Sequence, residues 1–91
     1  MFMKRNVDFL LREVADTMVI VPVGEATSGF PGMITVNATG AYLWELLEKE
    51  QTIASLAQAL VERYTVDEEQ ALVDAQAFVQ KLLPTGAIIQ G

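Results

Sequence analysis

The sequence contains neither cysteine nor histidine among its 91 residues. The absence of cysteine excludes disulfides, thiol nucleophiles and thiolate metal sites, and it leaves the redox compartment open. The absence of histidine excludes imidazole metal ligands and imidazole acid–base catalysis. The glycines of the segment GEATSGFPG are not followed by the Gly-Lys-Ser/Thr of a phosphate-binding loop. We therefore expect no metal and no nucleotide cofactor.

Long hydrophobic runs and an excess of basic residues are also missing. No run approaches the ~20 apolar residues of a membrane span, and the N-terminal segment has no extended apolar stretch typical of a secretion signal. We therefore expect a soluble, cytoplasmic protein. Six Lys plus Arg face twelve Asp plus Glu, which gives a formal net charge of −6. Because neutralisation of phosphates drives most nucleic-acid affinity, this balance argues against DNA or RNA as the partner.

What the chain does have is apolar residues, at 52% of the composition. This content argues against disorder, and the length suits one small core. No repeat, low-complexity segment or linker interrupts the sequence. We therefore predict a single domain over residues 1–91.

The first third of the sequence predicts three antiparallel strands. Residues 9–14 and 17–23 are rich in β-branched and large apolar side chains, and Ala15 and Asp16 form the turn between them. Pro22 cannot donate a ladder hydrogen bond, so its end of the second strand should lie at an edge or a bulge. Residues 24–32 have the composition of a loop, and residues 33–36 form a short third strand.

The stretch VNATGAYLWELL, residues 36–47, joins that strand to a helix. Asn37-Ala38-Thr39 fits the N-glycosylation pattern. The alternative is that Asn37 or Thr39 caps the helix by accepting a free backbone N–H of its first turn. Without a secretion signal, we prefer the cap.

Three helices fill the remainder. The first covers residues 40–49 and is apolar over more than half its circumference, so it should be buried on two sides. The second covers residues 53–64 behind a Thr52 cap. The third begins at Asp67, with Gln70 as its capping-box partner, and ends at Pro84. Residues 87–89 either form a closing strand or pack as a tail. The third helix carries a predicted apolar stripe of Ala71, Leu72, Ala75, Phe78, Val79 and Leu82.

Three strands followed by three helices indicate an α+β fold, of the winged helix-turn-helix type at this size. Within this order the sequence has a series of short motifs: Gly32-Met33-Ile34, Val36-Asn37, Thr39-Gly40, Leu43-Trp44-Glu45, Thr52-Ile53, residues 60–64, Asp74, Phe78-Val79 and residues 82–86. Their order and spacing resemble the coenzyme PQQ synthesis protein D (PqqD) family, whose modules are also called RiPP recognition elements, and the resemblance spans residues 9–89. Three departures occur: Val36 replaces the usual Leu, three residues separate Asp74 from Phe78 where two are usual, and Pro84 interrupts the last link.

The resemblance implies a non-catalytic peptide chaperone. Such modules bind the leader of a ribosomally made precursor peptide as an extra strand beside the third strand, opposite the third helix. They present the peptide to a separate modifying enzyme, such as a radical SAM protein in PQQ biosynthesis. It also implies that Asn37 turns the chain while Tyr42 and Trp44 anchor the first helix beneath the sheet. The implied peptide-binding residues are Met33, Ile34, Thr35, Val36, Asp74, Phe78 and Lys81.

The residues themselves support peptide binding but leave alternatives open. A short edge strand offers unpaired backbone groups to an incoming strand. Phe78 could equally be a core residue, and Asp74 and Lys81 could be a solvated margin. Clustered carboxylates on helix surfaces favour solvation over catalysis, so we expect no enzymatic activity. A structural or oligomerisation module without a peptide ligand is the second hypothesis, and a winged-helix DNA-binding protein is the third.

Overall fold

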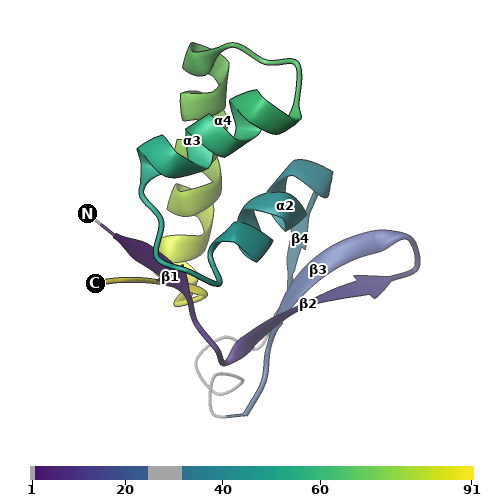
Figure 1. Ribbon diagram of the computed structural model, residues 1–91. Helices are drawn as coiled ribbons and strands as arrows, with labels where there is room; N and C mark the ends of the chain where they lie inside the picture. Colours follow the sequence, from purple (N-terminus) through teal and green to yellow (C-terminus); the bar gives the residue numbers. More distant parts are fainter. Residues whose placement is uncertain (1, 25–31) are drawn as a thin grey trace.

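The computed structural model describes residues 2–24 and 32–91, so most of the predicted loop at residues 24–32 lies outside the described residues. The described residues confirm the α+β fold, with antiparallel strands followed by three helices (Figure 1). In chain order the elements are β1 (Met3–Arg5), β2 (Phe9–Val14), β3 (Thr17–Pro22), β4 (Ile34–Val36), α2 (Ala38–Leu46), α3 (Ile53–Arg63), α4 (Glu68–Leu82), the 3-10 turn η1 (Leu83–Thr85) and β5 (Ile88–Gln90).

The three predicted strands form one antiparallel sheet in the order β2-β3-β4. The turn at Ala15 and Asp16 is confirmed, and both residues have positive φ, 51° and 68°. Two left-handed residues in a two-residue loop are typical of the type I′ hairpin turn, whose twist matches that of the strands. β3 ends at Pro22 and β4 begins at Ile34, so each strand is one residue shorter than predicted.

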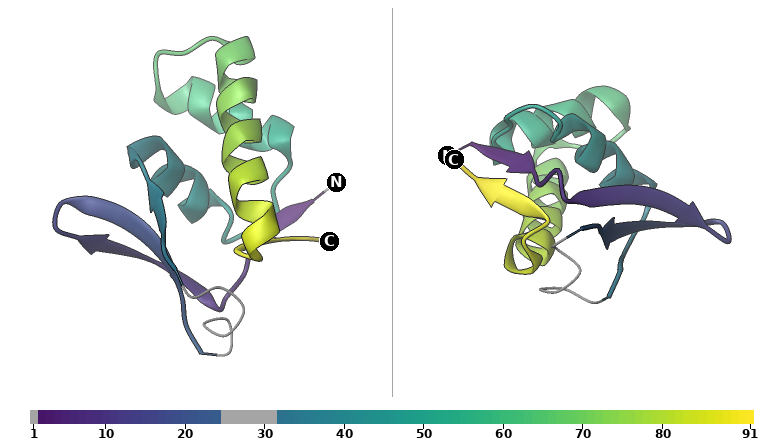
Figure 2. Two further views of the ribbon diagram at one scale, coloured as in Figure 1. Left: turned by 180° about the vertical axis from the view of Figure 1, so that it is seen from behind. Right: turned by 90° about the horizontal axis from the view of Figure 1, so that it is seen from below.

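The structure has a second, two-stranded sheet. The sequence indicated its C-terminal strand as one of two alternatives and did not indicate β1. β1 pairs antiparallel with β5, and Met3 also forms a bridge with Gln51. The N–H of Gly91 donates to the carbonyl of Phe2 at 2.9 Å, and β1 and β5 lie side by side (Figure 2). The closing segment is therefore a strand, at 88–90, and it needs β1 as its partner.

The strand-to-helix junction is capped by Asn37. Its Oδ1 accepts the N–H of Gly40 at 2.8 Å, which confirms the cap. The helix begins at Ala38 and ends at Leu46, so the predicted range 40–49 starts two residues late and ends three residues late. Thr39 lies inside the helix and is not the cap.

Of the other two predicted caps, the one at Thr52 is confirmed and the one at Asp67 is confirmed in part. Thr52 caps α3 and forms a complete capping box with Ser55. Asp67 accepts the N–H of Gln70 at 2.7 Å, but the Gln70 side chain donates to Oδ1 of Asp74 at 2.8 Å. The predicted Asp67–Gln70 capping box is therefore wrong in its second half, because a carboxylate one turn further along the helix takes the amide.

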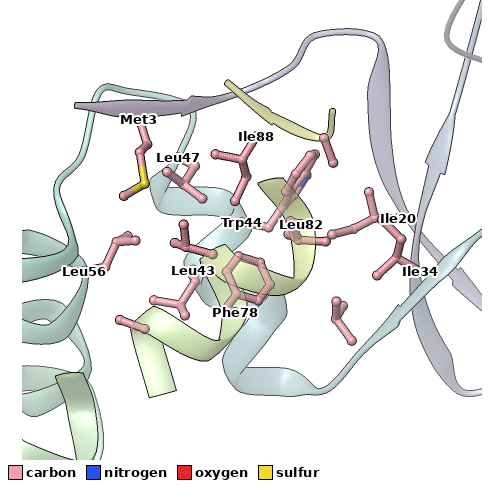
Figure 3. Packing of buried hydrophobic residues seen from close by; sticks show 14 of the residues in the cluster. Met3, Ile20, Ile34, Leu43, Trp44, Leu47, Leu56, Phe78, Leu82 and Ile88 are labelled. Carbon is pink, nitrogen blue, oxygen red and sulfur yellow. The ribbon is translucent and has the colours of Figure 1, made fainter. Parts of the chain in front are cut away.

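One hydrophobic core holds the elements together, with α2 between the three-stranded sheet and the pair α3 and α4 (Figure 1). Trp44 is buried as predicted, and Arg5 lies over its ring at 5.9 Å. Tyr42 lies against Tyr64 of the α3 C-cap instead, at 6.1 Å between ring centroids. Leu72 is 40% exposed, so it is not part of the buried stripe of α4. Figure 3 labels ten core residues: Met3, Ile20, Ile34, Leu43, Trp44, Leu47, Leu56, Phe78, Leu82 and Ile88.

Candidate functional site

A groove of about 290 Å³ lies between β4, the first turns of α2, and α4. In the view from behind, β4 and α4 both lie on the near side of α2 (Figure 2). We call this cavity the β4–α4 groove. Its lining residues are Thr35, Val36, Asn37, Thr39, Gly40, Leu43, Asp74, Ala77, Phe78 and Lys81.

The floor of the groove depends on the missing side chain of Gly40. A Cβ at this position would lie 3.1 Å from Cε1 of Phe78 and 3.1 Å from Cβ of Val36. Both distances are shorter than ordinary carbon–carbon contact. Gly40 therefore allows α2 to pack closely against both β4 and α4, which form the two walls of the groove.

Phe78 lies both in the core and at the groove. Its side chain is 8% exposed and belongs to the core cluster, among the residues drawn in Figure 3. It also lines the groove beside Ala77. The ring is therefore a core residue that also borders the groove.

The direction of the backbone groups on β3 follows from a hydrogen bond at the end of the β2–β3 hairpin that lies away from the turn. The N–H of Val23 donates to the carbonyl of Asp8, next to β2, at 2.8 Å. Backbone groups of successive strand residues point to opposite sides, so Val19 also points to β2. Met18 and Ile20, on either side of Val19, consequently point to β4.

On β4, the same alternation places one residue toward the open edge. Val36 is opposite Met18, and Ile34 is opposite Ile20. These two pairs therefore exchange the hydrogen bonds of the ladder, and the N–H and carbonyl of Thr35 point away from β3. Among the described residues, no strand pairs with this side of β4, since it ends the sheet order.

The contact made by Lys81 agrees with this direction. Its Nζ donates to the carbonyl of Thr35 at 2.7 Å, across 46 positions of sequence. A side chain from α4 reaches this oxygen only from the open edge of the sheet. The groove thus contains one strand residue, Thr35, whose N–H faces outward and whose carbonyl is held by an ammonium group.

Two charged side chains line the groove, and both come from α4. Lys81 is exposed and Asp74 is half-buried. Asp74 lies seven residues before Lys81, or about 10 Å along the helix axis. The groove therefore presents a negative group toward one end and a positive group toward the other, with the ring of Phe78 between them.

The structure brings five of the seven predicted residues together. Thr35, Val36, Asp74, Phe78 and Lys81 line the groove. Met33 precedes β4 and is 60% exposed, and Ile34 points its side chain into the core, at 6% exposure. Neither lines the groove. The lining residues that sequence reasoning did not name as a site are Asn37, Thr39, Gly40, Leu43 and Ala77.

Three features are absent from the part of the chain that the structure describes. No group of three or more metal-ligating side chains gathers among residues 2–24 and 32–91. In the same ranges, no buried side-chain nitrogen or oxygen lacks a hydrogen-bond partner. Nor is any helix in this part of the chain both long enough and apolar enough to cross a membrane.

Comparison with known proteins identifies the family. The profile of coenzyme PQQ synthesis protein D (PqqD) matches residues 17–88. The chain belongs to the PqqD family. The match runs from the start of β3 to the start of β5, so it contains the whole β4–α4 groove.

Two solved structures share the fold of this PqqD-family chain. Lasso peptide synthetase B1 complexed with the leader peptide has a TM-score of 0.72 and 24% identity, covering 97% of this chain and 98% of that chain. TbiB1 in complex with the TbiA(beta) leader peptide has a TM-score of 0.73 and 19% identity, covering 97% and 96%. No curated protein matches the sequence.

Proposed function

We propose that the chain binds the leader of a ribosomally made precursor peptide and presents it to a separate modifying enzyme. The peptide adds as a strand to the open edge of β4 and lies in the β4–α4 groove. The observation that carries the proposal is the outward N–H and carbonyl of Thr35, beside a groove with an apolar floor. Strand addition needs both features, because backbone bonds supply affinity and pockets supply specificity.

The family and the fold support this proposal. The chain belongs to the PqqD family, and the two structural neighbours are both complexes with leader peptides. Their strands and helices match nearly the full length of this chain, so β4 and α4 have counterparts in the same fold. The proposal places the chain in the cytoplasm, where ribosomal precursors are made.

The chain itself acts in recognition and not in catalysis. The charged groups of the groove are one carboxylate and one ammonium, without the pair of acidic groups used in general acid–base hydrolysis. We therefore assign the chemistry to a partner enzyme, such as a radical SAM protein, and no cofactor to this chain.

Proline at position 35 tests the proposed strand addition. Thr35→Pro removes the outward N–H and leaves the ladder bonds of Ile34 and Val36 with β3 in place, and an edge strand tolerates proline at such a position. We expect Thr35→Pro to weaken binding of a peptide selected on the wild-type protein by phage display by roughly tenfold or more in isothermal titration calorimetry.

Two controls separate the backbone from the side chain. Thr35→Ser keeps the N–H and should bind as the wild type does. Val36→Pro removes an N–H that points to β3, so it should lower the melting temperature where Thr35→Pro does so far less. Wild-type affinity in a folded Thr35→Pro protein would rule out strand addition at this edge.

A further inference from the structure

The contact between Lys81 and Thr35 occupies the position that an added strand needs. The carbonyl of Thr35 accepts Nζ of Lys81 at 2.7 Å. In an antiparallel or parallel ladder, an incoming strand donates its N–H to the same outward carbonyl. The oxygen has two lone pairs, but the ammonium group lies on the outward side from which the incoming N–H must approach, so the two donors crowd the same side of one oxygen. Lys81 is exposed and is free to move toward solvent.

Lys81 has no carboxylate partner among the described residues. Within the described residues its side chain donates one hydrogen bond, to the carbonyl of Thr35. Asp74, the other charged residue of the groove, accepts a hydrogen bond from Gln70 and lies two helical turns away. When a peptide displaces Lys81, the ammonium group consequently needs an acceptor from the peptide or from water.

We propose that Lys81 covers the open edge of β4 in the free protein and pairs with a carboxylate of the bound peptide. Once it has left the Thr35 carbonyl, Lys81 favours an Asp or Glu of the peptide close to the residue that pairs with Thr35. The inference rests on the proposed function, since it concerns the same groove. It adds that the groove, at the end where Lys81 lies, binds an acidic side chain of the ligand.

The negative charge of the whole chain confines the preference for acidic ligand side chains to the surroundings of Lys81. The net charge is −6, so an acidic side chain of a ligand is disfavoured at most of the surface. Beside Lys81 the same side chain gains a pairing of opposite charges, whereas a lysine would meet a like charge. Cross-strand and surface pairs of this kind change affinity by roughly fivefold between matched and mismatched charges.

A charge-reversal selection tests the inference. A displayed library of random 12-residue peptides is selected on the wild-type protein, on Lys81→Glu and on Lys81→Met, and the enriched sequences are compared. We expect Asp or Glu at one fixed position with the wild type, Lys or Arg at that position with Lys81→Glu, and no charge preference there with Lys81→Met. Asp74→Asn is the matched control, and it should keep the acidic preference.

A second measurement examines the free protein. Removal of the Lys81 contact changes the hydrogen bonding of the Thr35 carbonyl, so Lys81→Met should shift the amide ¹⁵N resonance of the next residue, Val36. An unchanged resonance would refute the covering of the edge.

The outcomes also separate this inference from the proposed function. Enriched peptides that shift the Thr35 amide but show the same residues for all three proteins would overturn the role of Lys81 and leave peptide binding intact. If no enriched peptide shifts the Thr35 amide in any protein, both the inference and the proposed function fail.

Discussion

At the scale of the residue, the site depends on what Gly40 lacks and on where Thr35 points. Gly40 leaves room for the ring of Phe78 and for Val36, and Thr35 turns its backbone groups to the open edge. The first feature is the absence of a side chain, and the second is a property of the backbone. The side-chain identity of Thr35 therefore matters less to the groove than its position between two ladder residues.

Gly40→Ala tests the close approach at the floor of the groove. A Cβ would lie 3.1 Å from both Phe78 and Val36. Overpacking costs about 1–3 kcal/mol, and the better helix propensity of alanine offsets up to ~1 kcal/mol. We expect a net loss of about 1 kcal/mol in urea unfolding. The loss should shrink in a Phe78→Leu background, and an equal loss in both backgrounds would mean that the ring is not the obstacle.

Some of these residues were predictable from the sequence and others were not. The cap at Asn37 and the burial of Trp44 follow from local patterns, a cap residue before an apolar run and an aromatic on the apolar side of a helix. The contact of Lys81 with Thr35 joins residues 46 positions apart. Only the packing of α4 beside β4 brings them together, so no local pattern indicates the contact.

At the scale of the element, the long and periodic segments were predictable and the shortest were not. The helices α3 and α4 have apolar spacings close to 3.6 and recognisable caps. β1 has three residues, MKR, and exists because β5 and Gln51 pair with it from distant parts of the chain. A three-residue segment has too little pattern to identify a strand by itself.

Two methionines test the importance of β1. Met3 on β1 is 3% exposed in the core, whereas Met33 just before β4 is 60% exposed. Met3→Ala should destabilise the protein by about 2–5 kcal/mol, because it removes a buried side chain. Met33→Ala should change stability by less than about 0.5 kcal/mol. Urea melts of the two variants measure both, and similar losses would contradict the burial of Met3.

At the scale of the whole molecule, an acidic domain uses a groove with one charge of each sign. The net charge of −6 opposes nucleic-acid binding by the pair α3 and α4, whose exposed positions include Glu62, Glu68 and Glu69. In the groove, Asp74 and Lys81 balance each other, so peptide affinity should rest on backbone bonds and apolar contact. The fold class could be predicted from the sequence, and the direction of the open edge required the sheet register.

Hydrogen exchange and amide shifts of ¹⁵N-labelled protein, titrated with a peptide selected on the wild-type protein by display, test strand addition most directly. We expect shifts along Thr35, Val36 and the face of α4 from Asp74 to Lys81. We also expect the exchange of the Thr35 amide to slow when its N–H gains a partner on the peptide. Shifts confined to α3, with the Thr35 amide exchanging as fast as in the free protein, would contradict peptide binding at β4.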